Sequence, residues 1–188
     1  MDDILGIICA RKGSKRLPGK NEKVIDGISL TERSLQTLHA AGIEQLVVAT
    51  DFMLDFDIQK YGATHLFRPE NISEDNVPLQ ETIKWVYYSM QKDYKYVVYL
   101  MPNCPMISVE IVKKAIKMLT EGRFNVIRSY NGQGDENGMI AVRTKYLMDH
   151  FIDVYCGGIV CPGDEIHDER DYLSVKKIME GPSDQLDK

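Results

Sequence analysis

The chain has 188 residues, of which 44% are hydrophobic and 27% charged, a size and composition that suit one domain with a well-filled core. Its formal net charge of −5 argues against a general nucleic-acid or membrane-surface binder, because such proteins carry a broad excess of Lys and Arg. The cysteines form no CxxC pair, which disfavours a zinc site or a disulfide framework.

Apolar runs of strand length alternate with stretches of helical periodicity. Residues 4–10 form the first apolar run, and residues 29–42 place leucines near helical spacing before a stop at Gly42. The sequence then predicts a strand over 44–50, a short helix over 53–62, a strand over 64–68, a helix over 78–92, a strand over 95–101, a helix over 108–122 and a strand over 125–130. This rhythm predicts an α/β fold with a mainly parallel sheet covered by helices on both faces.

The chain shows no sign of a second domain or a membrane anchor. It contains neither an internal repeat nor an apolar run near the roughly 20 residues of a membrane span, and acidic residues precede its first apolar stretch, unlike in a secretory signal. We therefore expect one domain over 1–180, a flexible polar tail over 181–188, and a cytoplasmic protein that partners neither nucleic acid nor membrane.

The loop after the first predicted strand, residues 10–21 with the sequence ARKGSKRLPGKN, concentrates positive charge. In a parallel α/β sheet, ligands bind beyond the carboxyl ends of the strands, and that is where this loop should lie. Glycines let its backbone approach an anion, and basic side chains supply charge; these are Gly13, Gly19, Arg11, Lys15, Arg16 and Lys20. The loop is therefore predicted to bind phosphate, with a solvated cationic turn as the alternative.

Two common phosphate loops do not match this spacing. A Walker A loop has four residues between its glycines and then Lys with Ser or Thr, whereas here five residues separate Gly13 from Gly19, and Lys20 is followed by Asn21. The dinucleotide fingerprint GxGxxG is absent as well. A different class of phosphate loop is indicated.

Residues 10–21 closely resemble the signature loop ARxGSKRxPGKN of the CMP-sugar synthetases, which include the acylneuraminate and 3-deoxy-manno-octulosonate cytidylyltransferases. Further segments resemble that family's motifs in the same order, so that the resemblance covers nearly the whole chain. They are VVATD (47–51), the stretch over 60–83 with its RP pair, YLMPNCPMIS (99–108), ENGMIAVRTKYL (136–147) and DEIHDERDYLSVKKIM (164–179).

This resemblance implies a three-layer α/β/α, Rossmann-like nucleotidyltransferase fold. It also implies a reaction in which a hydroxyl of a small acidic acceptor attacks the α-phosphate of CTP and pyrophosphate leaves, assisted by Mg²⁺. By the family's motif, Arg11 and Lys20 are expected to hold and polarise the triphosphate. Further nucleotide contacts are expected from Ala10, Gly13, Ser14, Lys15, Arg16, Asn21 and Asp51. For Asp51, which ends a strand, a helix N-cap is an equal alternative.

The acceptor half of the family pattern is altered. Where the family's turn carries Gln, Thr, Ser and Arg, this chain has Met101, Asn103, Cys104 and Ile107, so an amide and a cation are missing. Met101 and Asn103, together with Asn137 from the family's NG pair, are the expected acceptor contacts. The changes weaken a sialic-acid assignment and make a smaller or less polar acceptor, such as a phosphonate, a serious alternative.

The family's DID motif, whose two aspartates are expected to bind Mg²⁺, is altered too. Glu165 and His167 stand in their places, and Asp168 follows. A carboxylate suits this hard cation, whereas an imidazole suits it poorly. The three residues are the candidate metal ligands, with a solvated turn before the last helix as the alternative.

Relatives carry an arm of some dozens of residues, used for dimerisation, where residues 129–138 make a short polar connection here. We expect either a monomer or a dimer formed by another surface. Three hypotheses follow: a cytidylyltransferase for a sialic-acid-like or related sugar acid, one for a phosphonate or other small acid, and a nucleotide-binding homologue without catalysis.

Overall fold

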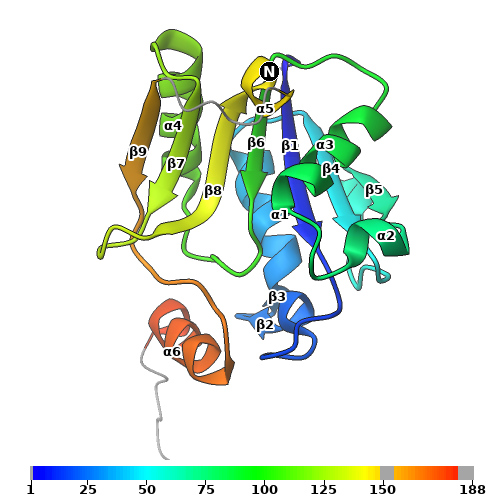
Figure 1. The fold of residues 1–188 in the computed structure, drawn as a ribbon. Coiled ribbons are helices and arrows are strands. Elements are labelled where there is room, and N and C mark those ends of the chain that lie inside the picture. Colours follow the sequence, from blue (N-terminus) through cyan, green and yellow to red (C-terminus); the bar gives the residue numbers. More distant parts are fainter. Residues whose placement is uncertain (1, 149–154, 182–188) are drawn as a thin grey trace, which may run out of the picture.

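The computed structural model describes residues 2–148 and 155–181. A seven-stranded sheet in the order β5-β4-β1-β6-β8-β7-β9 forms its centre (Figure 1). Strand β8 is antiparallel to both of its neighbours, and the other neighbouring strands are parallel. The strands are β1 (Ile4–Ala10), β4 (Gln45–Thr50), β5 (Thr64–Phe67), β6 (Tyr96–Leu100), β7 (Val126–Tyr130), β8 (Glu136–Arg143) and β9 (Cys156–Val160).

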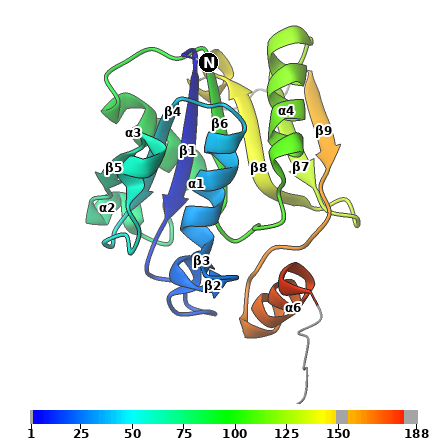
Figure 2. The same ribbon diagram turned by 180° about the vertical axis from the view of Figure 1, so that it is seen from behind.

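Helices cover both faces of this sheet, which confirms the predicted three-layer α/β fold. Helices α1 (Leu30–Ala40) and α4 (Val109–Glu121) pack on one face, and α3 (Leu79–Ser89) and α5 (Thr144–Met148) on the other (Figures 1 and 2). Every residue of β1 is buried, as expected for a central parallel strand between two helical layers.

A small subassembly lies beyond the carboxyl ends of β1 and β4. It contains the 3₁₀ helix η1 (Lys20–Glu22), the hairpin of β2 (Val24–Ile25) and β3 (Ile28–Ser29), and helix α6 (Glu169–Glu180), which Figure 1 shows below the sheet. Leu17, Leu30, Ile166 and Tyr172 are buried together there. The loop after β1 is thereby packed against the C-terminal helix.

Most predicted elements are confirmed, with boundaries shifted by one to a few residues, but the helix over 53–62 is wrong. A single 3₁₀ turn, η2 (Ile58–Tyr61), forms there, because Asp57 accepts the N–H of Gln59 and Gly62 already ends the turn. The remaining helix is α2 (Glu70–Ser73), which the sequence did not predict. Residues 182–188 of the expected tail lie outside the described residues.

The thiols, the helices and the connection between β7 and β8 each bear on an expectation from the sequence. Cys9, Cys104 and Cys161 are buried thiols without disulfides, as small apolar side chains in a core. Among the helices described, none has both the length and the apolar character to cross a membrane. Residues 131–135 alone connect β7 to β8, so the short polar connection is present as a tight turn.

Candidate active site

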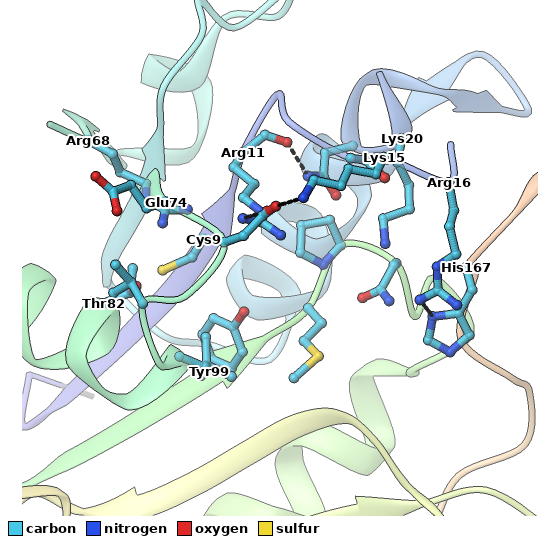
Figure 3. Close-up of a pocket in the computed structure, with 18 residues that line it drawn as sticks. Cys9, Arg11, Lys15, Arg16, Lys20, Arg68, Glu74, Thr82, Tyr99 and His167 are labelled. Atoms are coloured by element: carbon cyan, nitrogen blue, oxygen red, sulfur yellow. Dashed lines mark hydrogen bonds and ion pairs between the residues drawn. The ribbon is translucent and has the colours of Figure 1, made fainter. Parts of the chain in front are cut away.

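A cavity of about 520 Å³ lies beyond the carboxyl ends of β1 and β6 (Figure 3). Three segments distant in sequence and His167 form its wall. The lining residues are Cys9, Arg11, Ser14, Lys15, Arg16, Lys20 and Asn21 from the first segment, Arg68, Glu74, Asp75, Val77, Leu79 and Thr82 from the second, and Tyr99, Met101, Pro102 and Asn103 from the third. The cavity thus stands where an α/β sheet places its ligands.

The loop after β1 is held by its own polar side chains and by β4. Asp51 accepts the backbone N–H of Lys12 at 2.7 Å, and the amide of Asn21 donates to the carbonyl of Arg11 at 2.9 Å. Asn21 is buried, and its own carbonyl accepts from the Thr31 hydroxyl. Asp51 and Asn21 therefore shape the loop, and Asp51 supports it from outside the cavity wall.

The four basic side chains that the loop after β1 contributes to the cavity wall fall into two pairs. Arg11 and Lys15 both contact the carboxylate of Asp75, Lys15 at 2.5 Å. The hydrogen bond from Lys15 and the charge of Arg11 lower the pKa of Asp75, so this carboxylate is ionised. An anion in the cavity would meet Arg11 and Lys15 already paired.

The second pair, Arg16 and Lys20, faces the C-terminal segment. Arg16 lies 3.3 Å from Nδ1 of His167, and the ammonium of Lys20 donates to the carbonyl of Ile166 at 3.3 Å. Burial lowers the pKa of Lys20, and the nearby carboxylate of Glu165 opposes that shift. A partly desolvated ammonium at this position is suited to binding an anion strongly.

The three candidate metal ligands do not converge. Glu165 contacts Nε2 of His167 at 3.3 Å and accepts from the Asn103 amide at 3.5 Å. The carboxylate of Asp168 instead accepts the N–H groups of Arg170 and Asp171 and caps α6. Within residues 2–148 and 155–181, no group of three or more His, Cys, Asp or Glu side chains could hold a metal ion. The Asp168 carboxylate is engaged at the start of α6, and its part in a metal site stays a prediction.

Replacing Asp168 by alanine is therefore expected to lower the midpoint of thermal unfolding by about 2–4 °C, since the cap of α6 is lost. Asp168→Asn should preserve the midpoint, because asparagine is an equally good N-cap. Thermal unfolding followed by circular dichroism measures both. A stable Asp168→Asn variant with weakened Mg²⁺ binding would contradict a purely capping role.

The end of the cavity away from the basic loop, the far end, has mostly neutral side chains. Cys9, Thr82 and Tyr99 lie at this end together with Arg68 and Glu74, and the four basic side chains of the loop and His167 lie toward the other (Figure 3). Burial raises the pKa of Cys9 to about 12 and that of Tyr99 well above its usual value, so both stay neutral. This end can receive a flat, uncharged ring.

Arg68 is the one Lys or Arg at this far end among the described lining residues. It is 7% exposed, one of its terminal nitrogens donates to the carbonyl of Ile72, and its Nε finds no partner among the described residues. The sequence contained two signals for it: Arg68 ends the predicted strand over 64–68, which puts it at the same sheet edge as the basic loop, and it belongs to the RP pair that resembles the family's. Val77, Leu79 and Thr82 carried no such signal.

The residues that were expected to contact the acceptor do not all lie at the cavity. Met101 and Asn103 line the cavity, whereas Asn137 is buried behind it, donating to the carbonyl of Gly163 at 3.1 Å. Ile107 is also buried, in the core under α4. Two residues expected to contact the nucleotide also lie outside the cavity wall: Ala10 ends the buried strand β1, and Gly13 is not among the lining residues. Asn137 therefore contributes to packing around the acceptor turn and not to the cavity surface.

A model of the cytidylyltransferase family matches residues 5–147. The chain belongs to this family. It is 31% identical over 121 residues to the CMP-N,N'-diacetyllegionaminic acid synthase of Legionella pneumophila, covering 61% of this chain and 52% of that protein. It is 32% identical over 117 residues to the N-acylneuraminate cytidylyltransferase of Escherichia coli, covering 61% of this chain and 28% of that protein.

This cytidylyltransferase chain spans about half the length, or less, of these curated relatives. Its fold is similar over nearly the whole chain to a CMP:2-keto-3-deoxy-manno-octonic acid synthetase complexed with CTP, with a TM-score of 0.74 and 16% identity, covering 95% of this chain and 99% of that one. The nucleotidyltransferase fold implied by the sequence is confirmed.

Proposed function

We propose that the protein transfers CMP from CTP to a small acidic acceptor and releases pyrophosphate. The observation that carries this proposal is the two-ended cavity, with the four basic side chains of the loop at one end and a far end that is neutral apart from Arg68 and Glu74 (Figure 3). Arg11, Lys15, Arg16 and Lys20 would bind the triphosphate, and the cytosine ring would lie among Val77, Leu79 and Thr82 beside Arg68. The spare Nε–H of Arg68 would then donate to the ring's carbonyl oxygen.

The chemistry assigned to the basic loop is charge neutralisation. When a hydroxyl attacks the α-phosphate, negative charge grows on the bridging oxygen of the departing pyrophosphate, and fixed cations stabilise it. Arg11 and Lys20 are both half-buried, where such stabilisation is larger than in open solvent. No covalent intermediate on the protein is needed.

We assign Mg²⁺ to the same site, held by Glu165. This ion commonly binds through one or two carboxylates together with substrate phosphates and water, so a single carboxylate fits it. His167 suits it poorly, and Asp168 is engaged by the cap of α6. When bound, the ion would neutralise phosphate oxygens. Glu165 contacts Asn103, which places it next to the acceptor turn.

For the acceptor, we propose a sugar acid of the kind named for the relatives, with the legionaminic and neuraminic acids as first choices. A phosphonate or other small acid is the second candidate, favoured by Met101 in the cavity wall and by the tight turn at residues 131–135. The same short turn supports a monomer, or a dimer formed by a surface other than the family's arm. The cytoplasm is the proposed compartment.

One assay tests the activity. Incubating the protein with Mg²⁺, each of the four nucleoside triphosphates and a panel of sugar acids and phosphonates is expected to give pyrophosphate with CTP and one acceptor class. Pyrophosphate release is measured by a coupled enzyme assay, and omission of the acceptor is the control. CTP binding without release for any acceptor would instead support a non-catalytic nucleotide-binding protein, and equal release with all four nucleotides would contradict the cytosine assignment.

A further inference from the structure

Asp75 occupies the phosphate end of the cavity as if it were a ligand. One of its carboxylate oxygens contacts the guanidinium of Arg11, and the other lies 2.5 Å from the ammonium of Lys15. All three side chains line the cavity, and Figure 3 draws the ion pairs within it. A phosphate group would present two oxygens to the same two cations in the same way.

The segment that carries Asp75 is only lightly attached to the rest of the protein. It runs from Pro69 to Pro78 between β5 and α3, and its one regular element is the four-residue helix α2. Its backbone–backbone hydrogen bonds are local, such as that from the N–H of Val77 to the carbonyl of Glu74 at 3.3 Å. Arg68 holds the carbonyl of Ile72, which lies three residues before Asp75. The Asp75 side chain is 43% exposed, so it can leave Arg11 and Lys15 without disturbing the core.

We propose that Asp75 is an internal anion that closes the phosphate end of the cavity and must be displaced by the polyphosphate of the incoming nucleotide. This inference rests on the proposed function only in placing phosphates at the basic loop. Ion pairs between exposed side chains are weak, so a triphosphate with several negative charges can break both. An anion of lower charge competes less well, which makes Asp75 a selector for polyphosphates.

The same contact bears on product release. After the reaction, pyrophosphate leaves, and Asp75 can return to Arg11 and Lys15 in its place. The exchange of one anion for another keeps both cations paired in the empty and the occupied states, so neither state leaves Arg11 or Lys15 uncompensated, and the displaced carboxylate of Asp75 is solvated instead. Without the carboxylate, pyrophosphate is expected to leave more slowly.

The test is the affinity of inorganic triphosphate for the wild-type protein, for Asp75→Asn and for Glu74→Gln, measured by calorimetry at low ionic strength. Asp75→Asn is expected to bind triphosphate about tenfold more tightly, because two weak pairs no longer compete. Glu74→Gln is the matched control: it removes one negative charge from the same wall, and no ion pair of its side chain is among those described. Its affinity should change much less, and both variants should melt like the wild type.

Each other outcome overturns the inference. Weaker binding by Asp75→Asn would mean that Asp75 holds Arg11 and Lys15 in place for the ligand. An equal gain in both variants would mean a general effect of charge, and no binding by any variant would mean that the loop does not bind phosphate. If triphosphate binds as expected while CTP binds no better and no acceptor reacts, the role of Asp75 stands and the proposed function fails.

Discussion

Lys20→Ala is expected to lower kcat/KM for CTP by about 10²- to 10³-fold without lowering the stability of the fold. The ammonium of Lys20 is half-buried in the cavity wall, and burial lowers its pKa. A cation that has already lost part of its hydration gains more from a phosphate oxygen than an exposed one does. Its loss should therefore exceed the effect of removing the exposed Lys15.

The measurement is steady-state pyrophosphate release, with the thermal midpoint determined in parallel. Lys12→Ala is the matched control, because Lys12 lies in the same loop, its side chain is exposed, and its described hydrogen bonds are those of the backbone, from its N–H to Asp51 and from the N–H of Ser14 to its carbonyl. That variant should remain within about twofold of the wild type. Wild-type turnover in Lys20→Ala would refute the assigned role, and a lowered midpoint would point to the contact with Ile166 as a structural one.

The sequence was sufficient for five of the seven strands of the sheet and for the basic loop because these signals are local. Strand β1 is a continuous apolar run, and its loop carries cations and glycines at a fixed spacing, so neither needs distant residues to be recognised. The loop's position then followed from a general rule about parallel sheets. The predicted helix over 53–62 is wrong for a local reason as well. Asp57 and Gly62 limit this segment to a single 3₁₀ turn.

The far end of the cavity could not be predicted from local sequence patterns. Val77, Leu79 and Thr82 read as an ordinary apolar start of a helix, and they reach the cavity only because α3 packs beside β1 and β6. Asp75 was likewise one acidic residue among several. Its importance comes from its ion pair with Arg11, a residue 64 positions earlier in the sequence. A contact between residues so far apart in sequence produces no periodic pattern that could predict it.

The acidic residues before α6 show how one pattern can serve two purposes. An aspartate followed three residues later by an acidic side chain suits a metal cluster, but it also begins a helix by capping. In the structure Asp168 and Asp171 exchange both hydrogen bonds of a capping box. Glu165, which lies before the helix, contacts His167 and Asn103, two residues of the cavity wall. Sequence alone could not separate the two uses.

Gly138→Ala is the second substitution with a large expected effect, and we expect it to lower the free energy of unfolding by about 2–4 kcal/mol. Gly138 has a φ of 46°, which non-glycine residues rarely adopt. An added Cβ would lie 2.3 Å from Cβ of Cys104 and 2.7 Å from Cδ1 of Ile107, both buried. The turn after β6 would have to move.

Because residues of that turn line the proposed acceptor side of the cavity, the substitution should affect acceptor binding as well as stability. The N–H of Met101 donates to the carbonyl of Gly138 at 2.7 Å, and both Met101 and Asn103 line the cavity, so a shifted turn moves the acceptor wall. At a temperature where the variant stays folded, KM for the acceptor should therefore rise more than KM for CTP. Urea unfolding and steady-state kinetics measure the two effects. Gly132→Ala, where a Cβ meets nothing within 4 Å, should leave both unchanged. Equal rises in the two KM values for Gly138→Ala would contradict the assignment of this turn to the acceptor.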